Sequence, residues 1–102
     1  MEFEELKTHN GEEVTLLGKR FRFCIESDLG GEWAIFYCLD EPLEIWATLN
    51  YDIRGIPISL RVNGEVIGYD AYQGEVKNWN HYLKIVEEKT FKLLLEKAKE
   101  NR

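Results

Sequence analysis

Apolar and polar residues alternate along most of residues 12–72 of this chain. Val14 and Leu16 flank a threonine, and Phe21 and Phe23 further along flank an arginine. An alternation with a period of two is typical of a β-strand that buries one of its faces. Glycine, proline and Asn-Gly interrupt the pattern at short intervals, so we predict six short strands in this part of the chain.

The first predicted hairpin turns at Gly18-Lys19. A glycine at the first central position suits a two-residue hairpin turn. This turn would pair Leu16 with Phe21 and Val14 with Phe23, which places apolar side chains opposite each other. The consistent pairing favours one register, since a shift by one residue would move all of these side chains to the other face.

The last predicted hairpin turns at Asn63-Gly64, a dipeptide that strongly favours a type I′ turn. It would pair Leu60 with Ile67 and Ile58 with Tyr69. The links between all the predicted strands are short, which favours antiparallel neighbours because parallel pairs need long crossovers. We therefore expect a six-stranded antiparallel meander.

Helical patterns are found near the two ends of the chain. From Trp79 the apolar residues recur with a period near 3.6, which predicts a helix over residues 79–100 with Asn78 or Asn80 as its N-cap. Residues 2–8 can form a short N-terminal helix. The predicted fold class is therefore α+β, with the meander as a curved sheet or half-barrel and the C-terminal helix packed on its concave face.

The loop before the third strand decides which of its side chains point inward. A three-residue loop of Leu29-Gly30-Gly31 would turn Ile35, Tyr37 and Leu39 to the concave face. That face would also contain the apolar residues of the other strands, namely Val14, Leu16, Phe21, Phe23, Ile25, Ile45, Leu49, Ile58, Leu60 and Ile67. The centre of the opposite, convex face would then carry Cys24 and a patch formed by Arg22, Phe36, Cys38, Trp46 and Thr48.

This convex patch is largely apolar, although a sheet face turned to water is normally polar. Three hypotheses account for it. Phe3 and Leu6 at the N-terminus fold back over the patch, a homodimer or another protein partner binds there, or the third strand has a different register. We expect the patch to be a protein-interaction site.

Composition and charge describe one domain over residues 1–102, with 31% charged residues, 44% hydrophobic residues and a net charge of -6. Residues 1–76 carry 15 acidic and 6 basic side chains, and such a surface repels phosphate. We therefore expect no direct nucleic-acid partner. The chain has neither an apolar run long enough for a membrane span nor a basic, apolar signal pattern at its start, so we expect a cytoplasmic protein with no membrane partner.

Motifs that carry chemistry are scarce. The two histidines and two cysteines have no metal-ligand spacing, and no nucleophile, phosphate-loop or dinucleotide motif is present, so we expect no metal and no cofactor. The expected function is a protein-interaction domain without catalytic activity, such as an adaptor, an inhibitor, an immunity-type protein or a viral accessory protein. The alternative is a small-molecule-binding or small catalytic domain with a concave aromatic pocket formed by Trp33, Tyr37, Tyr51, Tyr69 and His81.

Overall fold

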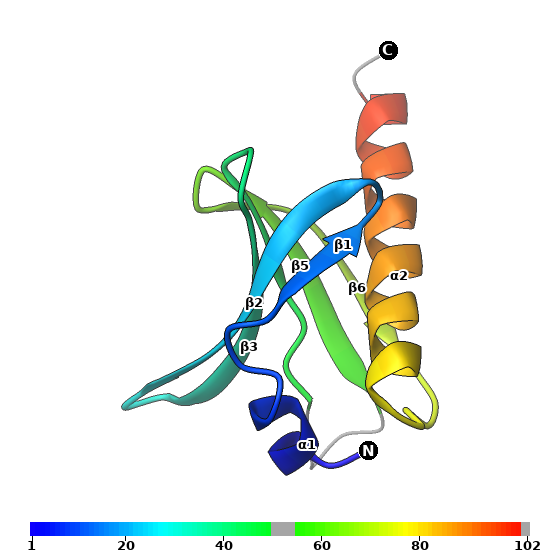
Figure 1. Cartoon of the computed structure of the whole chain (residues 1–102). Helices are drawn as coiled ribbons and strands as arrows, with labels where there is room; N and C mark the ends of the chain where they lie inside the picture. The colour runs from blue at the N-terminus through cyan, green and yellow to red at the C-terminus, as the bar shows by residue number, and fades with distance from the viewer. Residues whose placement is uncertain (50–54, 101–102) are drawn as a thin grey trace.

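The chain forms one open, curved sheet with a long helix packed along it (Figure 1). The computed structural model describes residues 1–49 and 55–100. The strands follow the order β1-β2-β3-β4-β5-β6, and each neighbouring pair is antiparallel, which confirms the predicted meander and the α+β fold. The elements are α1 (Phe3–Lys7), β1 (Glu13–Leu16), β2 (Lys19–Asp28), β3 (Gly31–Cys38), β4 (Leu43–Trp46), β5 (Ile56–Val62), β6 (Glu65–Tyr72) and α2 (Trp79–Glu100).

The first hairpin turns at Leu17-Gly18, one residue earlier than predicted. Both residues have positive φ angles, 55° and 73°, as a type I′ turn requires. Val14 therefore pairs with Phe21 rather than with Phe23. Because the pairing differs from the prediction by two residues, the apolar side chains keep their face. The Leu17 amide donates a hydrogen bond to the Glu87 carboxylate of α2 (2.7 Å), which helps to hold a leucine in a conformation that leucine disfavours.

The predicted register of the third strand is wrong by one residue. The connection between β2 and β3 consists of Leu29-Gly30 alone, and Asp28 pairs with Gly31. Gly31 has a φ of 131°, which is accessible mainly to glycine, and this allows the strand to begin one residue earlier than predicted. The structure therefore shows a different register for β3, which was one of the three hypotheses for the convex patch.

A one-residue shift exchanges the two faces of a strand. Phe36 lies on the inner face, the face turned toward α2, where it pairs with Phe23 at 4.9 Å between ring centroids. The predicted inward placement of Ile35, Tyr37 and Leu39 is wrong, since these residues belong to the outer face, which is turned away from α2.

The turn at Asn63-Gly64 is the predicted type I′ turn, with φ angles of 52° and 80°. A β-bulge between Leu60 and Arg61 then shifts the register of β5 and β6 by one residue. Leu60 consequently pairs with Gly68, and the predicted pair of Leu60 with Ile67 is wrong.

The bulge changes the contacts of β6 on both faces of the sheet. A Cβ atom at Gly68 would lie 3.3 Å from the Leu93 side chain, so α2 packs directly on the β6 backbone at this glycine. Beyond the bulge, Tyr69 pairs with Ser59 and faces outward, which corrects the predicted pair of Tyr69 with Ile58.

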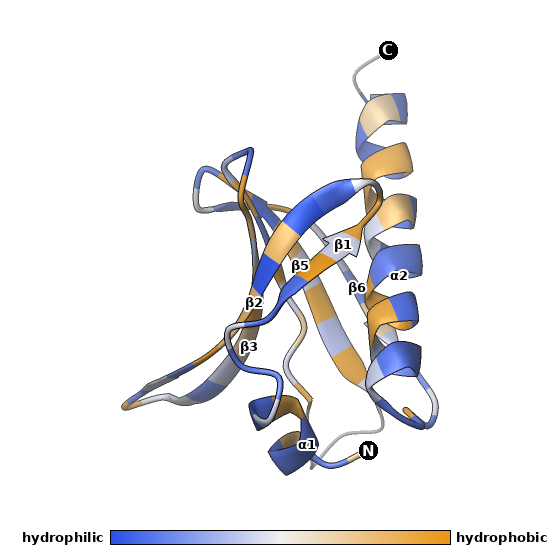
Figure 2. Cartoon of the chain, in the orientation of Figure 1, coloured by the Kyte–Doolittle hydropathy of each residue, from blue (hydrophilic) through white to orange (hydrophobic). Residues whose placement is uncertain are grey.

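The inner face of the sheet and α2 enclose the core, and Figure 2 shows apolar residues alternating with polar ones along β5. Tyr82 of α2 is fully buried in this core, and its ring centroid lies 5.9 Å from that of Phe36. The N-cap of α2 is Asn78, one of the two predicted residues, whose side-chain oxygen accepts a hydrogen bond from the His81 amide (2.9 Å). None of the described helices combines the length and the apolar character that a membrane crossing requires.

The short helix α1 lies near one end of the sheet, below β1 and β3 in Figure 1. Its side chains Phe3 and Leu6 are buried in the core cluster. The amino group of Met1 donates a hydrogen bond to the carbonyl of Val76 (2.8 Å), which joins the start of the chain to the segment before α2. The N-terminal segment therefore belongs to the core.

Candidate functional site

The outer face carries a row of side chains that crosses four strands. Ile35 of β3 pairs with Trp46 of β4, Trp46 pairs with Ser59 of β5, and Ser59 pairs with Tyr69 of β6. Ile35 is fully buried although it lies outside the core cluster, and the rings of Trp33 and Trp46 are 5.9 Å apart. The outer face therefore has a small apolar centre of its own.

A hollow of about 670 Å³ lies over this row. Its lining comes from α1, from the turn between β2 and β3, and from the outer face of β3 to β6. The lining side chains that matter most for its chemistry are Trp33, Trp46, Ser59, Arg61, Val66 and Tyr69. A volume of this size is typical of sites that bind a small ligand or a few side chains of a partner.

Arg61 lies over the ring of Trp46 inside this hollow. Its guanidinium carbon is 3.8 Å from the centroid of the Trp46 ring, which is a close cation–π contact. The Arg61 Nε atom is shielded from solvent and has no hydrogen-bond partner among the described residues. Contact with the ring holds the guanidinium in place, and a guanidinium is suited to binding a carboxylate or another planar acceptor.

Two carboxylates near the hollow have contacts of their own. Glu32 forms an ion pair with Lys7 at 2.9 Å. Glu44, which pairs with Arg61 in the sheet register, accepts a hydrogen bond from the Trp46 indole nitrogen at 2.9 Å. Within residues 1–49 and 55–100, Arg61 forms no ion pair, so the hollow combines an aromatic surface with a guanidinium that no described carboxylate holds.

Hydroxyl and thiol groups lie near the hollow. The Thr48 hydroxyl accepts a hydrogen bond from the Ala34 amide (2.8 Å), and no described hydrogen bond joins Ser59 to a base. Burial raises the pKa of the Cys24 thiol, which disfavours the nucleophilic thiolate. No three potential metal-binding side chains gather among the described residues.

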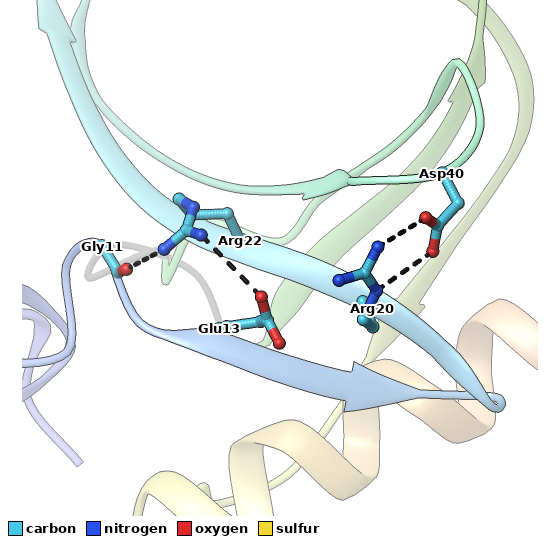
Figure 3. A network of polar contacts seen from close by, with 5 residues as sticks. All are labelled: Gly11, Glu13, Arg20, Arg22 and Asp40. Atoms are coloured by element: carbon cyan, nitrogen blue, oxygen red, sulfur yellow. Dashed lines mark hydrogen bonds and ion pairs between the residues drawn. The ribbon is translucent and has the colours of Figure 1, made fainter.

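The residues of the predicted interaction patch do not lie together in the structure. Arg22 lies on the outer face but belongs to a polar network away from the hollow (Figure 3). It donates a hydrogen bond to the Gly11 carbonyl (2.7 Å) and lies 3.8 Å from the Glu13 carboxylate. Nearby, Arg20 and Asp40 form an ion pair at 2.8 Å. These contacts join β2 to β1 on one side and to the turn after β3 on the other.

Two further residues of the predicted patch face the other way. Phe36 is fully buried in the core, and Cys38 pairs with Phe21 on the inner face, so their predicted place on the convex surface is wrong. The structure places Trp46 and Thr48 at the hollow, as residues of the outer face. The predicted patch thus contributes two of its five residues to the hollow.

The predicted aromatic pocket is divided in a similar way. Trp33 and Tyr69 line the hollow, but on the outer face rather than on the predicted concave face. Tyr37 also faces outward, and its hydroxyl donates a hydrogen bond to the Glu26 carboxylate (2.8 Å). Burial, together with this bond, raises the pKa of Tyr37. Tyr51 lies outside the described residues.

His81, which was predicted to stand beside that pocket, lies at the start of α2. Its Nδ1 atom accepts a hydrogen bond from the Lys77 amide (3.0 Å), and its ring lies edge-on to Tyr72. His81 is not among the residues that line the hollow. Its observed contacts organise the turn that leads into α2.

One of the hypotheses was that Phe3 and Leu6 fold back over the predicted patch. The structure shows this for Phe3 only, which reaches the edge of the outer face. Leu6 is fully buried in the core cluster, and Phe3 is buried while it also lines the hollow. The helix α1 therefore forms one wall of the hollow. Trp46 remains partly exposed beside it.

Sequence reasoning missed Arg61 and Val66 as site residues. The alternation in β5 places Arg61 on the outer face, but alternation alone does not show that its guanidinium lies on Trp46. Val66 pairs with Arg61 and is half exposed. The type I′ turn at Asn63-Gly64 could have indicated that Arg61 and Val66 are neighbours, because it brings these two residues opposite each other.

A comparison of the chain with protein-family models, with curated proteins and with solved structures found no match, so the geometry of the hollow carries the functional argument.

Proposed function

We propose that this chain is a protein-interaction domain without catalytic activity, and that its partner binds in the hollow on the outer face of the sheet. The observation that carries the proposal is Arg61, which is stacked on Trp46 and forms no ion pair with a described residue. Aromatic and arginine side chains are the residues that contribute most to protein interfaces.

The chemistry of the hollow defines what the partner presents. The aromatic rings of Trp33, Trp46 and Tyr69 favour an apolar side chain, and Arg61 favours a neighbouring carboxylate. Burial of an unpaired arginine against an apolar partner alone would be costly, because the charge would lose its water without gaining an acceptor. A partner segment that combines an apolar and an acidic residue therefore fits best.

The rest of the proposal concerns the setting of the protein. Cys24 and Cys38 are free thiols in the structure, which agrees with the reducing conditions of the cytoplasm. The net charge of -6 argues for a protein rather than a nucleic acid as the partner.

The experiment compares three variants that place a lysine on the surface. Trp46→Lys and Tyr69→Lys change the hollow, whereas Phe91→Lys changes an exposed aromatic residue of α2 and serves as the matched control. Proteins captured from a native lysate by the wild type are identified, purified and titrated by calorimetry against all four proteins. Loss of a central aromatic anchor is expected to weaken binding by about thirtyfold or more, with the control unchanged.

Folding is checked separately by urea unfolding, because Trp46 covers part of the apolar centre around Ile35. Tyr69 is 63% exposed, so Tyr69→Lys tests the hollow even if Trp46→Lys unfolds. The proposal is overturned if the wild type binds no protein, or if its partner binds the folded hollow variants as tightly as the wild type.

A further inference from the structure

The chain itself carries an exposed segment with the chemistry that the hollow favours. The β2–β3 hairpin extends away from the body of the protein as an arm, seen at the lower left of Figure 1. Leu29 at its tip is completely exposed. Next to it in the sequence is the exposed carboxylate of Asp28. An apolar and an acidic side chain therefore stand together at the end of the arm.

The tip of the arm has an ordered conformation before it meets any partner. One Asp28 carboxylate oxygen accepts a hydrogen bond from the Gly30 amide (2.7 Å), and the other accepts one from the Trp33 indole nitrogen (3.1 Å). A carboxylate can accept about four hydrogen bonds, so Asp28 retains the capacity to accept another from an arginine. A preorganised tip loses little conformational entropy on binding.

We propose that the occupant of the hollow is the arm tip of a second copy of this chain. The inference rests on the proposed function, and it names the partner. Leu29 of one copy packs against Val66 and Tyr69 of the other, whose side chains are 51% and 63% exposed in the single chain. Asp28 then supplies a carboxylate to Arg61, which forms no ion pair with a described residue.

Symmetry allows both contacts to form at once. Gly30 and Gly31 of the arm are part of the lining of the hollow, so the arm and the hollow are neighbours on one side of the molecule. A two-fold axis beside them brings each arm to the hollow of the other copy, and the assembly closes as a dimer with two identical contacts.

The first test is sedimentation velocity over a concentration series. The wild type is expected to form a dimer, and Leu29→Ser is expected to weaken the dimer about a hundredfold, because both contacts lose their anchor at about tenfold each. The matched control is Leu39→Ser, another exposed leucine that follows β3 at the opposite end of the strand. This control is expected to dimerise like the wild type.

The second test mixes two defective variants. Leu29→Ser has a defective arm and an intact hollow, whereas Arg61→Glu has an intact arm and a hollow that repels it. Each variant alone has two defective contacts. In the mixed dimer both substitutions fall in the same contact, where the second adds little to a contact that is already lost, because Leu29 and Arg61 act together there. The other contact is intact, so the mixed dimer is expected to associate about tenfold more tightly than either variant alone. Val66→Asp, at a half-exposed site, replaces Arg61→Glu if the latter does not fold.

The results separate the two proposals. A wild type that stays monomeric throughout, or folded variants that show no rescue on mixing, overturns the arm-in-hollow dimer. If the hollow variants Trp46→Lys and Tyr69→Lys still lose a captured protein in that case, the proposed function stands and its partner is a different protein. Equal loss of dimer in Leu29→Ser and Leu39→Ser also overturns the inference, because the effect would not be specific to the arm.

Discussion

The hydrogen bond between Tyr82 and Ala47 connects the first turn of α2 to the segment that leads from β4 to the hollow. The Tyr82 hydroxyl donates to the Ala47 carbonyl at 2.6 Å, and both residues are fully buried. Burial raises the pKa of Tyr82, so the hydroxyl stays protonated and remains a donor. Tyr82→Phe removes this donor and keeps the ring in its contacts with Phe36 and Trp79.

The expected cost follows from the burial of the acceptor. A carbonyl left without a donor and without water destabilises a protein by about 1 to 3 kcal/mol. Tyr72→Phe is the matched control, because the Tyr72 hydroxyl makes a longer bond of 3.3 Å to the Glu75 carbonyl at an exposed position. Water can replace that donor, so the control is expected to lose less than about 0.5 kcal/mol.

Urea unfolding followed by fluorescence measures both variants. With a slope of about 1 to 2 kcal/mol per molar urea for a domain of this size, Tyr82→Phe is expected to lower the midpoint by about 1 M and leave the slope unchanged. The reasoning is refuted if Tyr82→Phe and Tyr72→Phe have the same midpoint. In that case the Ala47 carbonyl has another donor, and the bond does not hold α2 against the end of β4.

Three further predictions concern stability. Leu60→Ala creates a cavity at a fully buried position of the inner face and is expected to lower the free energy of unfolding in urea by about 2 to 5 kcal/mol. A decrease below about 1 kcal/mol would contradict the place of Leu60 in the core. Gly64→Ala forces alanine to a φ of 80° and is expected to cost about 1 kcal/mol. Gly30→Ala requires no left-handed φ, and its Cβ would lie 3.2 Å from Asp28 Oδ1 and 3.7 Å from the Trp33 ring, so it is expected to be milder; equal costs would argue against the type I′ turn. The lysine and backbone hydrogen bonds of Asp70 lower its pKa to about 2. This carboxylate therefore stabilises the fold above about pH 4 and loses that contribution as the pH falls toward 2. A stability difference between the wild type and Asp70→Asn that does not shrink over this pH range would count against the assignment.

The order and direction of the strands could be predicted from the sequence. Alternation in β1, β2, β5 and β6, together with short turns, allows only antiparallel neighbours, because parallel strands need long connections. The helix α2 was equally predictable, since its residues Tyr82, Val86 and Leu93 recur on one face. These features depend on local geometry and periodicity, which are properties of the sequence alone.

The faces of β3 could not be predicted, because every side chain from Trp33 to Leu39 is apolar or aromatic. Without alternation, the register depends on the length of a single turn, and Gly30-Gly31 fits a turn of either two or three residues. The bulge between Leu60 and Arg61 could not be predicted for a related reason. It accompanies the close approach of Leu93 in α2 to Gly68 in β6. Sequence periodicity contains no information about that distance.

The candidate site shows the same division between local pattern and long-range packing. Alternation and the Asn63-Gly64 turn are enough to place Trp46 and Arg61 on the outer faces of their strands. The contact between the guanidinium and the indole, and the outward position of Tyr69, depend on packing and register between the strands. The physical reason is that a face is set by each strand's own period of two, whereas a site is set by the register between strands, and register depends on turns, bulges and helix packing.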